Sequence, residues 1–198
     1  MNKTGILVLA MALLPACAFA VDGVVLINQA TVTAAGGFPY AISTSGSYKL
    51  SGNLLVPNGV NGIQISVSSV TLDLNGFSIT SADTSGSTSL LQIAGAVRSI
   101  TVRSGVLSCA SCTQIDNTQG GTFQSAGTVF EDLTLLQSSG GGGFDFGRSV
   151  ILRRVSFPGS GVSVSCPALV VDSLAAFFHS ITTVSTSCAY GFNSGPVI

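Results

Sequence analysis

The stretch "GIQISVSSVTLDLNGFSIT" (residues 62–80) decides the fold, because its alternation of apolar and polar residues changes phase twice. The apolar residues fall into three groups of alternating phase: Ile63 and Ile65, then Val70, Leu72 and Leu74, then Phe77 and Ile79. A residue inserted into a period of two sends the following side chains to the wrong face of a strand, unless the chain also bends. The phase changes therefore predict corners, at which successive strands turn and keep their apolar side chains pointing inward.

The same pattern recurs along the chain. Around the anchor Leu74, apolar residues stand two positions before and three and five positions after, and four later segments fit this template, with anchors at Val102, Phe130, Leu152 and Val171. The steps of 28, 28, 22 and 19 residues average about 24, which lies within the range of solenoid repeats. We therefore predict an all-β fold, a single-stranded right-handed parallel β-helix (solenoid) of about six to seven coils.

The main alternative is antiparallel. Asn75-Gly76 is a typical hairpin turn, and a β-sandwich built from such hairpins is the rival fold. The other repeats carry different residues at this corner: Arg103-Ser104, Glu131-Asp132, Arg153-Arg154 and Asp172-Ser173. Arginine is a poor choice where both turn residues need positive φ, so the parallel coil is favoured.

Segment 172–181 fits two interpretations. Its apolar residues at 174, 177, 178 and 181 have helical spacing, so both a further coil and a capping helix are open there, and we favour the coil.

The N-terminus predicts export. Residues 1–20 have a lysine near the start, an apolar run and a small-residue cleavage site, which are typical of a signal peptide cleaved between Ala20 and Val21. Residues 21–47 are then an N-terminal cap segment and residues 48–198 the β-helix domain. The protein is expected in the periplasm or outside the cell, with no transmembrane segment after signal removal. Lipid anchoring through Cys17 is the alternative, although Pro15 fits a lipobox poorly.

Export places the cysteines in an oxidising compartment. Signal removal leaves four, which allow three pairings, and sequence alone does not choose strictly among them. The short spacing of Cys109 and Cys112 favours a local structural disulfide, because no second motif completes a zinc site. Cys166 and Cys188 are 22 residues apart, one coil length, so we predict a second disulfide near the C-terminal end.

The N-terminal part of the chain resembles a known group. The runs "DGVVLINQ", "FPYAISTSGSYKLSGNLLVP" and "VTLDLNGFSI" are similar to exported bacterial proteins with right-handed parallel β-helix repeats, in the broad pectate-lyase-like group. The resemblance covers Asp22 to about Ile79, and only the repeat extends it further. It implies the fold and little about activity, because many such proteins have no assigned function.

Charged residues recur just after the anchors. Asn75, Arg103, Glu131, Arg153 and Asp172 form a predicted column of alternating sign after the Asn, which is typical of a solvated ladder that sets coil register. Pectate lyases of this fold use carboxylates for Ca²⁺ and an arginine as base, so the resemblance makes Asp132, Arg153 and Arg154 weak catalytic candidates. No Ca²⁺-type cluster is visible, and we expect no cofactor and no metal.

The position before the anchor is apolar in three successive repeats: Val129, Ile151 and Val170. This interaction stripe is expected to be covered by the chain itself, by a partner protein or by a second copy. With only 15 charged residues in 198 and a net charge of −1, a nucleic-acid partner is not expected. We expect a non-enzymatic exported module with a structural, partner-binding or glycan-binding role at the cell envelope or outside the cell. The alternative is a small polysaccharide lyase or hydrolase.

Overall fold

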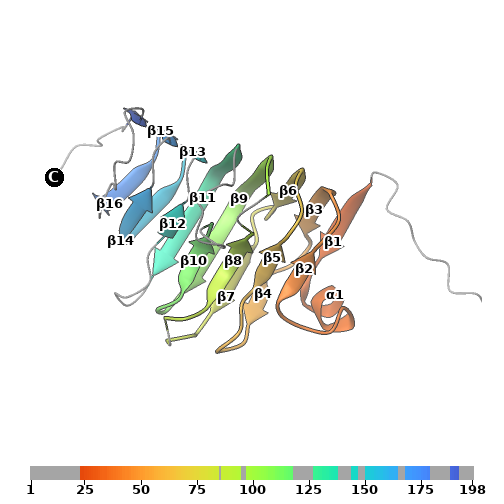
Figure 1. The fold of residues 1–198 in the computed structure, drawn as a ribbon. Coiled ribbons are helices and arrows are strands. Elements are labelled where there is room, and N and C mark those ends of the chain that lie inside the picture. Colours follow the sequence, from red (N-terminus) through yellow and green to blue (C-terminus); the bar gives the residue numbers. More distant parts are fainter. Residues whose placement is uncertain are drawn as a thin grey trace, which may run out of the picture.

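The computed structural model describes residues 23–84, 86–94, 97–117, 127–137, 144–146, 150–164, 168–178 and 188–191. These residues form one short helix and a 17-stranded sheet (Figure 1). The elements in chain order are β1 Val24–Ile27, α1 Gln29–Ala34, β2 Tyr40–Ile42, β3 Gly46–Leu50, β4 Leu54–Val56, β5 Ile63–Ile65, β6 Val70–Asp73, β7 Ser78–Ser81, β8 Ser89–Ile93, β9 Ile100–Cys109, β10 Thr113–Asp116, β11 Thr128–Gln137, β12 Phe144–Phe146, β13 Val150–Arg153, β14 Ser156–Val164, β15 Ala168–Val171, β16 Leu174–Phe178 and β17 Cys188–Gly191. The expected signal peptide, the Ala20–Val21 cleavage site and Cys17 lie outside the described residues.

Strands from successive turns of the chain lie side by side, and the pairings between them are parallel (Figure 1). The first face stacks β1, β3, β6, the start of β9, the start of β11, β13, β15 and β17 in that order. The second face continues from β4 and β7 through the ends of β9 and β11 to β14 and β16. The third face includes β2, β5, β8, β10 and β12. Each strand therefore pairs with the strand one turn away, and the predicted parallel all-β solenoid is confirmed.

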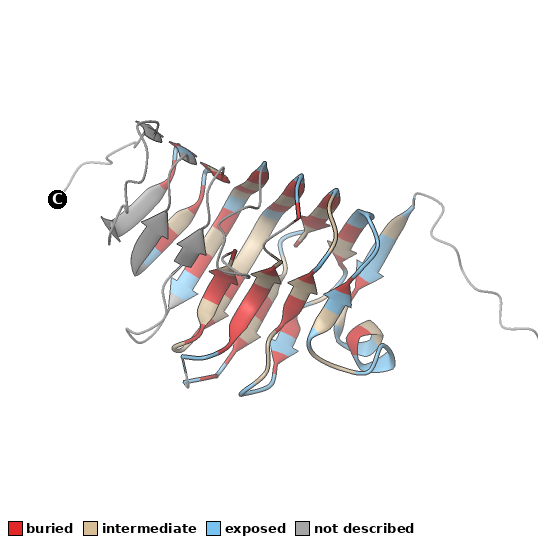
Figure 2. Ribbon diagram, viewed as in Figure 1, coloured by how far each residue is buried: buried red, intermediate tan, exposed pale blue. Residues whose placement is uncertain are grey.

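The core is made of side-chain columns that run along the stack. One inward column on the first face consists of Tyr48, Leu72, Val102, Phe130, Leu152 and Val170, all buried. On the second face, Leu54, Ile79, Leu107 and Leu135 form another. Buried and less buried positions alternate along many of the strands (Figure 2). Each buried aliphatic side chain contributes about 1.5–3 kcal/mol, so stability accumulates coil by coil.

Five successive corners after the first face, from the end of β6 to the end of β15, share one backbone feature. At each of these five, one residue other than glycine has positive φ, between 49° and 60°: Asn75, Ser104, Asp132, Arg154 and Asp172. Arg154 has positive φ and Arg153 does not, so this corner is not the turn with two positive-φ residues for which arginine is a poor choice. Only one residue of its corner pair adopts this conformation, so the chain bends there and does not reverse.

Asn75-Gly76 forms a tight turn without forming a hairpin. Both residues have positive φ, and the Phe77 amide donates to the Leu74 carbonyl at 2.8 Å. Nevertheless, β6 and β7 each pair with strands of the adjacent coils and not with each other. The antiparallel alternative is therefore excluded at the position where it was strongest.

The strand pairing around this corner differs from the alignment of the repeats expected from the sequence. Asp73 pairs with Arg103 and Ser78 with Val106. The corner between β6 and β7, which we call the first corner, is therefore two residues longer than the corresponding corner within β9. As a result Leu72, and not Leu74, aligns with Val102. In the last repeat the register moves by one residue, and Val170, not Val171, aligns with Leu152.

At the C-terminal side, the described part of segment 172–181 is a strand. β16 spans Leu174–Phe178 and pairs in parallel with β14, which favours the further coil over the capping helix.

Helix α1 covers part of the N-terminal end, along the side of β4. Asn28 and Thr31 form a capping box that begins the helix, and Val32 is buried against the core. The Gln29 side-chain amide accepts a hydrogen bond from the Leu55 amide at 3.0 Å and donates to the Leu55 carbonyl at 3.4 Å, so it occupies the free edge of β4. The expected boundary between residues 47 and 48 falls inside β3. With six residues, α1 is too short to cross a bilayer, and no other helix occurs among the described residues.

Candidate functional site

Three ion pairs join successive coils at the corner after the first face, which we call the charged corner. Arg103 Nη2 lies 3.1 Å from Asp73 Oδ2, and Arg153 Nη1 lies 3.6 Å from Glu131 Oε2. Arg154 makes a two-pronged contact with Asp132, Nε to Oδ1 at 2.6 Å and Nη2 to Oδ2 at 2.8 Å. These contacts join charges that lie one coil apart in sequence.

The strand register shows why the signs match. The outward position before the corner is occupied in order by Lys49, Asp73, Arg103, Glu131 and Arg153, so positive and negative charges alternate. The alternating ladder is as predicted, but its members need two corrections. Asp73 takes the place expected for Asn75, because the first corner is longer. Val171 takes the place expected for Asp172, because the last repeat is shifted by one residue.

Electrostatics hold the Asp132–Arg154 pair in its charged form. The hydrogen bond from Arg154 lowers the pKa of Asp132, and the positive charges of Arg154, Arg153 and Arg103 lower it further. The same hydrogen bond, which Asp132 accepts, raises the pKa of Arg154. The structure therefore places the three catalytic candidates Asp132, Arg153 and Arg154 at one corner, but the contact with Asp132 stabilises the protonated guanidinium of Arg154. Within the described ranges, no group of three His, Cys, Asp or Glu side chains is arranged to hold a metal ion.

The interaction stripe is present with one member changed. Val129 pairs with Ile151, and Ile151 pairs with Leu169, all on the outer side of the first face. Leu169 is 38% exposed, and Val129 and Ile151 are half-buried. Val170 was expected here and is instead fully buried in the inward column, because of the register shift in the last repeat. The outer strip is thus Val129, Ile151 and Leu169.

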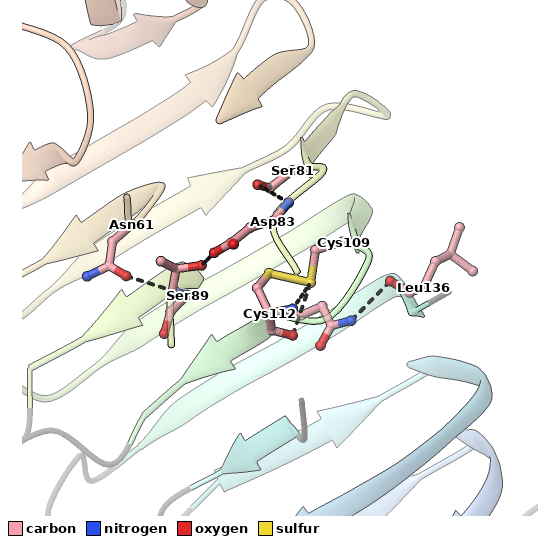
Figure 3. The surroundings of a disulfide bond; sticks show 9 residues. Asn61, Ser81, Asp83, Ser89, Cys109, Cys112 and Leu136 are labelled. Carbon is pink, nitrogen blue, oxygen red and sulfur yellow. Dashed lines mark hydrogen bonds between the residues drawn. A yellow bond between two sulfur atoms is a disulfide. The ribbon is translucent and has the colours of Figure 1, made fainter. Parts of the chain in front are cut away.

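The predicted bond between Cys109 and Cys112 is confirmed (Figure 3). It joins the end of β9 to the residue before β10, with the Cα atoms 5.8 Å apart and both side chains buried. Beside it, buried Asp83 accepts a hydrogen bond from Thr88 through its carboxylate, and its carbonyl accepts from the Ser111 amide. The disulfide therefore closes a corner in a polar part of the interior.

The other predicted disulfide is not tested. Cys188 belongs to β17, where its backbone pairs with Ala168, and Cys166 lies outside the described residues.

A hollow of about 460 Å³ lies at the N-terminal end of the stack. It is lined by the start of β1 with Val25, by Tyr40 of β2, by Tyr48 of β3 and by the corner segment 43–47 between those two strands. This hollow was not predicted from the sequence. The sequence feature that could have indicated the hollow is a segment rich in serine, threonine and glycine, flanked by two of the chain's three tyrosines.

Comparison of this chain with protein-family models, with characterised proteins and with solved structures gives no match.

Proposed function

We propose that the chain is an exported, non-enzymatic module with a structural, partner-binding or glycan-binding role at the cell envelope or outside the cell. In this proposal the solenoid is a right-handed β-helix of about six to seven coils, of the pectate-lyase-like kind, and its N-terminal signal peptide is removed on export.

The observation that carries the proposal is the pairing within the charged corner. A lyase base must lose its proton, whereas the contact with Asp132 raises the pKa of Arg154. A carboxylate that binds Ca²⁺ must offer its oxygens to the ion, whereas both oxygens of Asp132 accept hydrogen bonds from Arg154. The corner is therefore better suited to holding the coils in register than to catalysis.

The outer strip supports the binding part of the proposal. Its three apolar side chains occupy the same outward column, in which the earlier coils carry Thr71 and Thr101. A row of side chains that changes from polar to apolar along one face offers a partner protein or a second copy a defined surface.

One assay separates this role from the lyase or hydrolase alternative. Purified protein is incubated with a panel of acidic polysaccharides with and without Ca²⁺, and products are followed by absorbance and reducing-end release. We expect no product on any substrate. Product formation that Arg153→Ala abolishes would establish the enzyme and overturn the proposal.

Self-association through the outer strip is measured by light scattering after gel filtration across a range of concentrations. We expect an oligomer that Ile151→Asp dissociates and that Thr101→Asp, in the same column, leaves intact. An oligomer that is equally stable in both variants would place the interface elsewhere.

A further inference from the structure

The hollow lies beside β1, the first strand of the described part of the stack. The inward column of the first face ends with Val25 above Tyr48, and Val25 is 44% exposed although it continues a column of buried side chains. Helix α1 covers the side of β4 through Gln29, whereas the corner between β2 and β3 borders the open hollow. The backbone of the β2–β3 segment is hydrogen-bonded to the next coil. The Tyr40 amide donates to the Gly62 carbonyl at 2.8 Å, and the Gly46 amide donates to the Ser69 carbonyl at 3.0 Å.

The lining of the hollow is uncharged and rich in hydroxyl groups. It contains two phenols and the hydroxyls of segment 43–47, and no Asp, Glu, Lys, Arg or His side chain lines it among the described residues. Two of these hydroxyls are already engaged: Tyr48 donates to the Thr44 carbonyl at 2.7 Å, and Ser45 donates to the Ser68 carbonyl at 2.8 Å.

Other hydroxyls of the lining remain available. Among the described residues, the hydroxyls of Tyr40, Ser43 and Ser47 have no hydrogen-bond partner. Tyr40 is half-buried, so it is also partly accessible. Tyr48 pairs with Val25 across adjacent coils. Burial raises the pKa of Tyr48, and the neighbouring Tyr40 raises it further, so the floor of the hollow stays neutral well above physiological pH.

These groups select the chemistry of a ligand. A charged ligand would leave water without meeting a counter-charge, which is unfavourable in a neutral site. A purely apolar ligand would leave the free hydroxyls unpaired. A sugar ring satisfies both requirements, because its C–H faces pack on aromatic side chains while its hydroxyls exchange hydrogen bonds with serine, threonine and tyrosine. The volume of about 460 Å³ lies within the range of small-molecule sites.

We propose that this hollow binds a neutral saccharide, with Tyr40 as the packing surface and the hydroxyls of Ser43 and Ser47 as hydrogen-bonding groups. The inference deepens the glycan-binding part of the proposed function and rests on it. It places the glycan at the end of the stack and away from the charged corner.

The test titrates the purified protein with cellohexaose and xylohexaose, and in parallel with hexagalacturonate, by calorimetry. Tyrosine fluorescence is a second readout, because the chain has no tryptophan and 3 tyrosines. We expect a neutral hexasaccharide to bind. Tyr40→Ala should weaken binding at least about tenfold and Tyr40→Phe about threefold, while the matched variant Thr101→Ala, on the outer side of the first face, binds unchanged. Far-UV circular dichroism and thermal melting establish that each variant is folded.

Each contrary result has a distinct meaning. Unchanged neutral-sugar affinity in a folded Tyr40→Ala variant overturns the site. Binding of hexagalacturonate alone, lost in Arg153→Ala, overturns the inference and keeps the glycan role, at the charged corner. No binding of any of the three overturns the inference and the glycan role together, whereas the partner-binding role is decided separately by the light-scattering experiment.

Discussion

Gly105 and Leu74 meet across adjacent coils with no room for a side chain on Gly105. A Cβ on Gly105 would lie 2.4 Å from the Leu74 Cβ and 2.6 Å from the Phe77 carbonyl oxygen. In the following coil the equivalent inward position holds Leu133. The first corner is two residues longer, and its Leu74 fills the space that a side chain at position 105 would need.

We therefore expect Gly105→Ala to lower the free energy of unfolding by about 1–3 kcal/mol, as overpacking does elsewhere. Gly52→Ala is the matched control, because a Cβ there meets only the Asn28 Cβ at 3.7 Å. The control should stay within about 1 kcal/mol of the natural protein. Urea denaturation measures both, and equal stability of the two variants would contradict the packing described here.

The one-residue register shift in the last repeat predicts opposite responses at neighbouring positions. Val170 is fully buried and Leu169 is 38% exposed. Val170→Asn buries a polar amide and should reduce the unfolding free energy by about 3 kcal/mol or more, whereas Leu169→Asn should change it by about 0.5 kcal/mol or less. Thermal melting of the two variants checks this. The reverse order would restore the original alignment, with Val170 facing outward.

The Asp132–Arg154 pair makes stability depend on pH. The pKa of Asp132 is lowered in the folded state by the hydrogen bond from Arg154, so its stabilising contribution is fully present above the unfolded-state pKa. That contribution is lost as the pH falls through the lower folded-state pKa. Asp132→Asn removes the charge and keeps a residue that tolerates positive φ. We expect the variant to be less stable than the natural protein at pH 7, and the difference to shrink steadily as the pH falls below the unfolded-state pKa. A difference that persists unchanged in acid would exclude the ion pair as its cause.

The ladder itself is tested at Glu131, which lies between Arg103 and Arg153 in the same column. Glu131→Gln should lower stability by about 1 kcal/mol or less. Glu131→Lys should lower it more, because three positive charges then stand in a row. Urea titrations at about 0.05 M and 1 M NaCl should show the gap between the two variants closing at high salt. A salt-independent gap would mean that packing, and not charge, distinguishes them.

The Cys109–Cys112 disulfide closes a short loop, so its effect on the unfolded chain is small. Replacement of both cysteines by alanine should reduce the unfolding free energy by about 2 kcal/mol, near the lower end for native disulfides. Denaturation of the natural protein and the double variant under oxidising conditions measures the difference. A loss of folding altogether would show that the surroundings of Asp83 depend on this bond more than loop closure explains.

The sequence predicted the parallel stack because apolar residues with similar local spacing recur in five successive segments. Ile79 and Leu107 were correctly matched, since both follow their corners at the same distance. The strand before the first corner was placed two residues out of register. Leu72 and Leu74 are both apolar and both buried, so the pattern alone does not show which of them aligns with Val102.

The remaining differences have similar causes. The last repeat has three apolar residues in succession, Leu169, Val170 and Val171. Because polar and apolar residues do not alternate in this run, the sequence does not show which of the three points inward. The hollow at the N-terminal end involves no repeat at all. It depends on where the stack stops and on which strand α1 covers, and both are properties of the assembled fold rather than of any one segment.

The alternation of charge along the column from Lys49 to Arg153 constrains how such a chain can change in length. Removing a single whole coil would place two like charges beside each other, as Asp73 against Glu131. Removing two neighbouring coils would bring opposite charges together again. Insertions follow the same even-number rule, so duplication or loss within this part of the solenoid is expected to conserve its stability only when coils are gained or lost in pairs.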